Sequence, residues 1–291
     1  MYTIFDASDS FFRVKQKTEA LVPLLVQHGI DAVNPPVEIL EDVAKAKDVA
    51  QIVYDNGLKW GFLPMPVEFL HPDLGDEEFE DGLKKLATWA QTAGMIGVKY
   101  AYNPVFPGHN EYGYARNMER HVVKIKRISK VLEDSGIRYG IEFLGPPDLR
   151  QAFRHPFVHT VAGALALIDE TGADIGFVFD TFHWYCGTAD MDELYLAARN
   201  TDKMICLHVN DAIAGVGREG QKDLTRAMPM TTGVIDAAGI CKLFLDNGYS
   251  GPVLLEPILP TYERFENMKP EDVVAEVAQS YRKMKQIVIG V

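Results

Sequence analysis

Short apolar runs alternate with segments of helical period along the whole chain. The eight runs, each expected to form a strand, cover residues 3–8, 31–36, 58–69, 96–104, 138–145, 175–183, 204–211 and 251–257. The helices expected between and after them cover residues 17–29, 41–57, 76–94, 113–135, 160–172, 190–199, 234–248 and 270–286. Strands that alternate with helices indicate a parallel sheet. Eight such units in 291 residues predict an α/β fold, a single closed (β/α)8 TIM barrel.

Loop lengths indicate which end of this barrel carries the chemistry. No Gly/Ser linker interrupts the alternation, so we expect residues 1–291 to form one domain. A doubly wound open sheet is the alternative, but no GxGxxG turn follows the first expected strand. The longest irregular segments follow strands and cover residues 103–112, 143–158, 211–231 and 258–269. In a barrel these loops gather at the carboxyl-terminal mouth, where such folds place their active sites.

Charge and cysteine content narrow the choice of partner and compartment. Asp and Glu number 41 against 29 Lys and Arg, which gives a formal net charge of −12. The average field therefore repels nucleic acid and anionic lipid headgroups, and we expect neither as a partner. The three cysteines lack CxxC spacing, and the N-terminal stretch has no signal-peptide pattern. We expect a cytoplasmic protein without disulfides.

Four consecutive strands each aim one polar residue at the barrel axis. Side chains alternate between the two faces of a strand. In GIEFLG the apolar neighbours of Glu142 should face the helices, so Glu142 should face the axis. The same phase applies to Asp180 in FVFDTFH, His208 in ICLHVND and Glu256 in PVLLEP. The fifth to eighth strands therefore bring three carboxylates and one imidazole to the mouth.

This set of side chains suits a divalent metal ion. Three carboxylates buried together are costly unless they are neutralised by protonation or by a cation. Oxygen donors with one imidazole favour Mn²⁺, with Mg²⁺, Co²⁺ or Zn²⁺ as alternatives. Each residue alone has a plainer interpretation, as a strand-end cap or a hydrogen-bonded core histidine. Their shared phase favours the hypothesis that Glu142, Asp180, His208 and Glu256 bind one ion.

At these positions the chain resembles the xylose isomerase-like TIM barrels, the sugar phosphate isomerase/epimerase superfamily that includes ketose 3-epimerases, inosose dehydratase and endonuclease IV. The resemblance covers essentially the whole chain and rests on GIEFLG, FDTFH, LHVND and LLEP. It implies that Glu142 and Glu256 act both as metal ligands and as the acid/base pair, with Asp180 and His208 as further ligands. It also places His183 close to the substrate as a catalytic candidate; a structural histidine is the alternative there.

The resemblance implies a sugar or polyol isomerase or epimerase that acts through a metal-bound enediolate. If the second step expels a hydroxyl group, the same site becomes a dehydratase or lyase of a keto-sugar or inosose. A hydroxypyruvate isomerase-like activity also stays open. Three carboxylates over one dication leave a formal charge of about −1, which favours a neutral substrate over an anionic one. Family barrels often pair, so a homo-oligomer stays open as well.

Further residues near the mouth are candidates for substrate contact. We expect such contacts from Lys99, His109, Asp148, Trp184 and Arg218. Lys99 is inward by strand phase, and Asp148 lies just beyond the fifth strand; Trp184 could support a sugar face or simply pack. A phosphate pocket could come from the loop cations Arg218, Lys222 and Arg226. We interpret that loop instead as a solvated face.

Two other classes of protein stay in view. An endonuclease IV-like nuclease shares the HxND and Asp-x-x-His motifs, and His71 and His109 lie where the resemblance places zinc ligands. That three-zinc site also needs an Asp-x-His after the seventh strand, whereas residues 211–231 contain no histidine. The acidic charge argues against DNA binding too. A non-catalytic sugar-binding barrel is the second class, although the presence of both glutamates argues against it.

Overall fold

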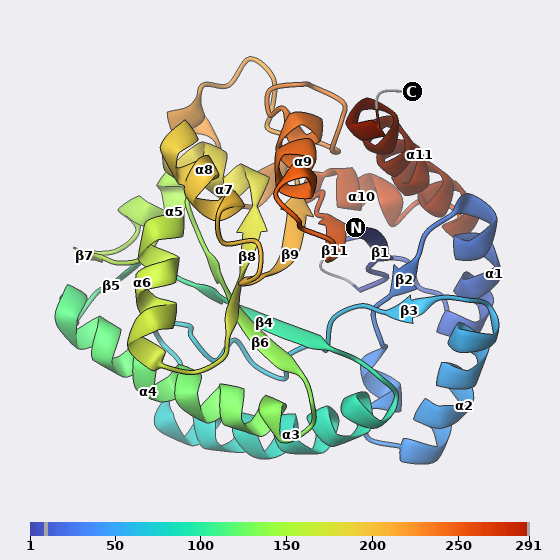
Figure 1. Ribbon diagram of the computed structural model, residues 1–291, viewed down its shortest axis with the longest axis horizontal. Coiled ribbons are helices and arrows are strands. Elements are labelled where there is room, and N and C mark those ends of the chain that lie inside the picture. The colour runs from blue at the N-terminus through green and yellow to red at the C-terminus, as the bar shows by residue number, and fades with distance from the viewer. Residues whose placement is uncertain (9–10, 290–291) are drawn as a thin grey trace.

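The computed structural model describes residues 1–8 and 11–289 and shows the expected TIM barrel (Figure 1). Eight parallel strands lie in the order β3-β2-β1-β11-β9-β8-β6-β4. Their bounds are Tyr2–Phe5 (β1), Ala32–Val33 (β2), Lys59–Trp60 (β3), Tyr100–Val105 (β4), Arg138–Phe143 (β6), Gly176–Asp180 (β8), Met204–Val209 (β9) and Pro252–Leu255 (β11). The two end strands meet where Phe62 forms a parallel bridge with Tyr100. Leu63 N also donates to Tyr100 O at 2.9 Å, so the sheet closes on itself.

Eight helices of the described chain surround the strands. Their bounds are Thr18–His28 (α1), Val43–Asp55 (α2), Asp76–Met95 (α3), Tyr114–Glu133 (α4), Val161–Thr171 (α6), Met191–Ala198 (α8), Ala237–Asp246 (α9) and Pro270–Ile289 (α11). Gly29 ends α1 in the left-handed conformation at φ 70°, as its position in the sequence predicts. Within the described ranges, no helix is long and apolar enough to cross a lipid bilayer.

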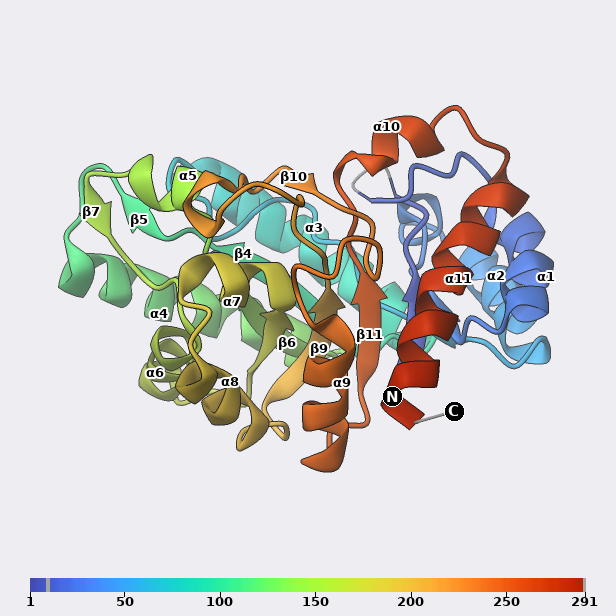
Figure 2. The same cartoon turned by 90° about the horizontal axis from the view of Figure 1, so that it is seen from above.

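Short elements that the hydrophobic pattern did not predict decorate one end of the barrel. They are the helices α5 (Pro147–Gln151), α7 (Thr181–Gly187) and α10 (Thr261–Phe265), and the strands β5 (Gly108–His109), β7 (His155–Pro156), β10 (Thr225–Arg226) and β12 (Leu259–Pro260). Figure 2 shows β5, β7, α5, β10 and α10 along the same edge of the molecule. These elements follow barrel strands, so the long loops do gather at the carboxyl ends of the strands.

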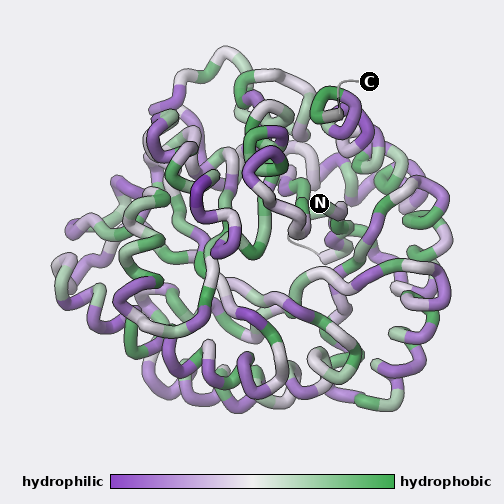
Figure 3. The backbone as a smooth tube through the Cα atoms, in the orientation of Figure 1, coloured by the Kyte–Doolittle hydropathy of each residue, from purple (hydrophilic) through white to green (hydrophobic). Residues whose placement is uncertain are grey.

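The strands bury apolar side chains on both faces. An outer layer packs against the helices and contains the neighbours of each polar position, such as Phe143 and Phe179. An inner layer fills the barrel with Ile4, Ala32, Phe62, Val178, Ile205, Cys206 and Leu254. Figure 3 shows hydrophobic and hydrophilic segments alternating along the outer helices, as expected where one face of a helix packs on the barrel. The predicted alternation holds except at Ile205 and Cys206, where the pairing of β9 with β8 is irregular. The filled interior leaves the carboxyl-terminal mouth as the place for a site.

The last helix fastens the first strand to the last. The Tyr281 hydroxyl donates to Ile4 O at 2.7 Å and accepts from Leu255 N at 3.1 Å. Tyr281 is buried, so water cannot replace either partner. This contact ties α11 to both β1 and β11 close to their carboxyl ends.

Replacing Tyr281 with phenylalanine should destabilise the barrel without emptying its core. The change removes the buried hydrogen bonds of the Tyr281 hydroxyl, so we expect the free energy of unfolding to fall by about 1–3 kcal/mol. Urea denaturation measures this loss. The control, Tyr195→Phe on the exposed side of α8, should stay within about 0.5 kcal/mol of wild type. Equal losses in the two variants would show that the hydroxyl contacts of Tyr281 do not hold the strands.

Candidate metal centre

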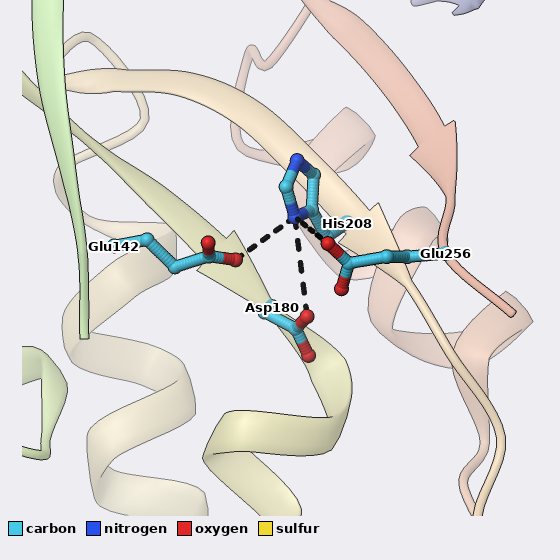
Figure 4. A group of neighbouring side chains, drawn as sticks. All are labelled: Glu142, Asp180, His208 and Glu256. Carbon is cyan, nitrogen blue, oxygen red and sulfur yellow. Dashed lines mark ion pairs between the residues drawn. The ribbon is translucent and has the colours of Figure 1, made fainter. Parts of the chain in front are cut away.

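Glu142, Asp180, His208 and Glu256 meet at the carboxyl ends of four neighbouring strands (Figure 4). Glu142 lies in β6, Asp180 ends β8, His208 lies in β9 and Glu256 directly follows β11. All four are buried, with exposed fractions of 5%, 0%, 0% and 5%. One possible ligand atom from each residue lies within 4.8 Å of the others. The structure therefore brings together the four residues that strand phase directs to the axis.

Sheet register places the two glutamates above and below the other two residues. Asp180 pairs with His208, so these two side chains stand at the same level of the sheet. Glu142 pairs with Val178, two residues before Asp180. Glu256 stands two residues beyond Leu254, which pairs with His208. The glutamates thus approach from opposite flanks and from different heights, and their longer side chains span the difference.

His208 Nδ1 is the atom that faces all three carboxylates. It lies 2.8 Å from Glu142 Oε1, 3.4 Å from Glu256 Oε1 and 3.9 Å from Asp180 Oδ2. Burial alone would lower the pKa of His208, but the charges of Glu142 and Glu256 outweigh it and raise that pKa well above its ordinary value. Apart from its ion pair with His208, Glu142 Oε1 has no hydrogen-bond partner among the described residues.

The donor atoms fit a single divalent ion. Two ligand atoms at about 2.1–2.2 Å from one ion are at most about 4.4 Å apart. The spacing of the four residues, up to 4.8 Å, needs only a small inward movement of side chains to satisfy this limit. Three carboxylates with one imidazole form a hard donor set, which suits a divalent cation.

A cation from the loop after β9 already lies among these carboxylates. Arg226 Nη1 is 3.0 Å from Asp180 Oδ2 and forms an ion pair with Glu256 Oε2. The Arg226 side chain is only 3% exposed, and Asp223 accepts from its Nε and Nη2 at 3.0 Å. Burial would lower the pKa of Arg226, but Glu256, Asp180 and Asp223 raise it, so the guanidinium stays charged. The interpretation of Arg226 as part of a solvated loop face is wrong.

Arg226 changes the charge of the site. It reaches the mouth because β10 pairs with β12 and crosses the ends of the barrel strands. A histidine that binds a metal must be neutral, and with His208 in that form the three carboxylates and the one guanidinium together carry a formal charge of −2. One divalent ion would therefore neutralise the site, rather than leave the charge of about −1 expected from the carboxylates alone.

Asp180 links the site to a helix that strand periodicity could not reveal. Its Oδ1 accepts from Phe182 N at 2.6 Å and His183 N at 3.0 Å and so caps α7. The strand expected to reach residue 183 therefore ends at Asp180. Burial would raise the pKa of Asp180, but His183 and Arg226 overcome that effect and lower it. Asp180 thus stays a carboxylate whose Oδ2 is directed into the site.

Asn210 is a site residue that the sequence reading missed. Its Nδ2 donates to Asp180 Oδ2 at 2.8 Å and to Glu256 Oε2 at 3.3 Å. Asn210 follows His208 by two residues and is fully buried. The same alternation that selected His208 would have placed Asn210 on the inner face. Glu256 differs from Asp180, because burial and the neighbouring carboxylates raise the pKa of Glu256 well above its usual value.

His183 joins the cluster from the first turn of α7. It is 1% exposed. Its Nε2 lies 3.8 Å from Asp180 Oδ2, 4.0 Å from Glu142 Oε1 and 3.4 Å from Arg226 Nη2. The candidate catalytic histidine is therefore beside the carboxylates, and its position depends on the cap that Asp180 provides.

The five residues expected to contact substrate lie outside the cluster of four. They are Lys99, His109, Asp148, Trp184 and Arg218. Lys99 is exposed and precedes β4, at the amino end of the sheet and away from the mouth. The Trp184 indole belongs to the outer apolar layer, and its N–H donates to Asp190 O at 2.9 Å. Strand phase fixes a face and not a height along the strand, so Lys99 lies at the end of β4 opposite the mouth. The packing of Trp184 corresponds to the alternative given for it above, and its contact with a substrate stays a prediction.

The other three expected contacts have structural partners. The His109 ring stacks on Tyr112, and its Nδ1 accepts from Glu111 N at 2.9 Å. Both carboxylate oxygens of Asp148 accept from the backbone N of Asp223, at 3.1 and 3.2 Å. The Arg218 guanidinium donates to the carbonyl oxygen of Thr188. Asp148 therefore acts on the site indirectly, by holding the loop that carries Arg226.

Fold and site together define a TIM barrel with a buried carboxylate–histidine group at the carboxyl ends of its strands. The family described as Xylose isomerase-like TIM barrel matches residues 22–284, and the chain belongs to that family. Among curated proteins, an inosose isomerase from Bacillus licheniformis is 24% identical over 199 residues, which span 67% of this chain and 68% of that protein.

Solved structures share the whole fold. A xylose isomerase domain protein from Alicyclobacillus acidocaldarius subsp. acidocaldarius is 22% identical, with a TM-score of 0.80 over 99% of both chains. The IolI protein with a bound zinc atom is 18% identical, with a TM-score of 0.79 over 98% of both chains. A D-psicose 3-epimerase from Clostridium cellulolyticum H10, solved with D-tagatose, is 13% identical, with a TM-score of 0.71 over 99% of both chains.

Removing Arg226 should destabilise the metal-free protein strongly. Arg226→Gln leaves buried carboxylates without their cation, so in EDTA we expect the free energy of unfolding to fall by about 3–5 kcal/mol. Saturating Mn²⁺ should restore part of the loss, because the ion supplies the missing positive charge. Chemical denaturation with and without metal measures both effects. Arg127→Gln, which breaks an ion pair between half-exposed side chains, should cost at most about 1 kcal/mol; a similar small loss for Arg226→Gln would contradict its role.

Proposed function

We propose that this protein is a divalent-metal-dependent isomerase or epimerase of a neutral sugar or polyol. The observation that carries the proposal is the placement of Glu142 and Glu256 on opposite flanks of His208, within one buried group (Figure 4). Two carboxyl groups on opposite sides of a substrate can remove a proton from one face and return one to the other. The similarity to an inosose isomerase and to a D-psicose 3-epimerase supports a sugar as substrate.

Glu142, Asp180, His208 and Glu256 would hold the ion. Bound there, the ion would polarise a carbonyl and its neighbouring hydroxyl and so acidify the hydrogen on the carbon between them. We expect Mn²⁺ because carboxylate oxygens dominate the donor set. Mg²⁺, Co²⁺ and Zn²⁺ are the alternatives. Zn²⁺ is included because the IolI protein binds a zinc atom.

Proton transfer and charge stabilisation would fall to different side chains of the site. One glutamate takes the proton from carbon, and the other returns it to the opposite face for epimerisation or to the adjacent carbon for isomerisation. Arg226 and His183 lie 3.4 Å apart beside Asp180, where a donor can stabilise charge that develops on a substrate oxygen. Glu256 in its protonated form would donate to a departing hydroxyl group, which is the dehydratase alternative.

A nuclease fits the structure less well. Among the described residues, the four-residue group is the only set of three or more His, Cys, Asp and Glu side chains placed to hold an ion. His71 Nδ1 accepts from Asp73 N at 3.1 Å, and His109 Nδ1 also accepts from the backbone. The net charge of −12 adds repulsion of DNA. We therefore propose a small-molecule substrate and no nucleic acid partner, in the cytoplasm.

Metal analysis tests the proposed ligands. After stripping and reloading with Mn²⁺, we expect about one tightly held ion per chain, measured by elemental analysis together with the rise in melting temperature. His208→Asn should lose the ion, whereas His28→Asn on α1 should retain it. Close to three zinc ions per chain would favour the nuclease, and no binding at saturating Mn²⁺ would favour a non-catalytic sugar-binding barrel.

Glu256→Gln tests the acid/base assignment. The amide removes the titratable group but keeps an oxygen donor, so the fold should persist while turnover falls about 100- to 10,000-fold. NMR in heavy water would follow exchange of carbon-bound hydrogen in D-fructose, D-psicose, D-tagatose and myo-inosose, and the product identifies epimerisation, isomerisation or dehydration. Glu119→Gln, an exposed change on α4, is the control. Near-normal exchange in Glu256→Gln would refute its role.

A further inference from the structure

We propose that Asp6 and Asn34 form a hydroxyl-binding subsite on the arc of the mouth opposite Glu142, which selects an uncharged polyhydroxy substrate. This inference rests on the proposed function and deepens it, because it names what the far end of the substrate must carry. Neither residue belongs to the metal-type group of four. Both follow the two short strands at the start of the chain, β1 and β2.

Sheet register places Asp6 beside Glu256. Ile4 belongs to the inner layer and pairs with Leu254, whereas Phe5 belongs to the outer layer. Continued by two residues, this register directs Asp6 to the inner face at the level of Glu256. Asp6 is only 7% exposed. A buried carboxylate therefore stands at the carboxyl end of β1, the strand next to the one that Glu256 follows.

Asn34 flanks Asp6 on the other side. Ile4 also pairs with Ala32, so Asn34 stands beside Asp6 at the end of β2. Phe62 N donates to Asn34 Oδ1 at 2.7 Å, which fixes the amide and leaves its NH₂ group to hydrogen-bond with Asp6. Gly61 makes room for this arrangement, since a Cβ there would lie 2.1 Å from Asn34 Oδ1.

Packed aromatic side chains connect the Asp6–Asn34 pair with the metal-type cluster. Burial raises the pKa of Asp6, while hydrogen bonds from Ser8 and Asn34 and the charge of His208 act in the opposite direction. Phe62, whose backbone N–H holds Asn34, packs against the Tyr102 ring, and Tyr102 packs against the His208 ring, each with ring centroids 5.2 Å apart. These packed rings connect the Asp6–Asn34 pair with His208.

Chemistry then determines what this subsite can bind. A buried carboxylate beside an amide accepts hydrogen bonds from hydroxyl groups and repels phosphate and carboxylate groups. A substrate whose carbonyl end is held by Glu142, Asp180, His208 and Glu256 would present its remaining hydroxyls to Asp6. The inferred substrate is therefore a neutral ketose or cyclitol with hydroxyls beyond the reacting carbons. Hydroxypyruvate and terminal sugar phosphates do not match this subsite.

Asp6→Asn separates this role from a purely structural one. Asp6 Oδ1 accepts from Ser8 N at 2.8 Å, and the asparagine carbonyl can keep that contact while the charge is lost. In the Mn²⁺-loaded protein we would compare kcat/KM for hydrogen exchange on the best ketose with that on dihydroxyacetone, which lacks the far hydroxyls. Loss of a hydrogen bond to a charged group should lower this ratio about 10- to 100-fold. Asp48→Asn, exposed on α2, should leave the ratio unchanged.

Several outcomes would overturn the subsite. An unchanged ratio, an equal fall on both substrates, or loss of bound metal in Asp6→Asn would each do so. Thermal unfolding checks the fold, and Asp6→Ser, whose hydroxyl can also accept from Ser8 N, is the second variant. If neither variant folds, wild type decides: a ketose phosphate ester that binds as tightly as the free ketose contradicts the subsite.

Calorimetry with myo-inositol and ribitol separates failure of the subsite from failure of the proposed function. Polyol binding that weakens at least tenfold in Asp6→Asn, in a protein that exchanges no ketose hydrogen, would keep the subsite and reject the isomerase. Normal exchange on ketoses, with polyol binding and the kcat/KM ratio insensitive to Asp6→Asn, would keep the isomerase and reject the subsite.

Discussion

Three carboxylates buried within a few ångströms of one another are the constraint on which the rest of the site depends. Left unpaired, they would cost several kcal/mol each or take up protons. The chain compensates them from separate elements: the guanidinium of Arg226, the amide of Asn210 and the backbone N–H groups at the start of α7. These partners also fix which carboxylate oxygen faces which neighbour. Glu256 directs Oε2 to Arg226 and Oε1 to His208. Compensation and orientation of the ligands are therefore achieved by the same contacts.

The long loop after β9 is ordered around this requirement. The Asp211 carboxylate accepts from the backbone N atoms of Ala212, Thr232, Gly233 and Ile235 and so folds the loop back on its own beginning. Asp148 fastens its middle through the backbone of Asp223, whose side chain and carbonyl hold Arg226. The sequence of this loop suggested an irregular, solvated segment, but the folded loop places the buried guanidinium of Arg226 at the mouth.

How far the sequence predicted this molecule depends on the range of the interaction concerned. Strand phase is a local property, and it correctly directed Glu142 and His208 to the inner face. Phase alone misplaced Lys99, since it does not tell the amino end of a strand from the carboxyl end. Arg226 was beyond local reasoning, because its burial depends on β10 pairing with β12 across the mouth. The helix after Asp180 was missed for a related reason: a side-chain cap, rather than the apolar pattern, ends the strand there.

The order of the strands gives the site its two faces. Along the sheet order β11-β9-β8-β6, the two middle strands carry His208 and Asp180 at one level. The glutamates come from the two flanking strands, β11 and β6. Glu142 stands two residues below that level and Glu256 two residues above it, so the two glutamates approach from opposite flanks and at different heights. Closure of the barrel places β1 alongside β11, so Asp6 follows the strand next to the one that Glu256 follows. The asymmetric arrangement of these side chains therefore arises from backbone register, before any loop contributes to the site.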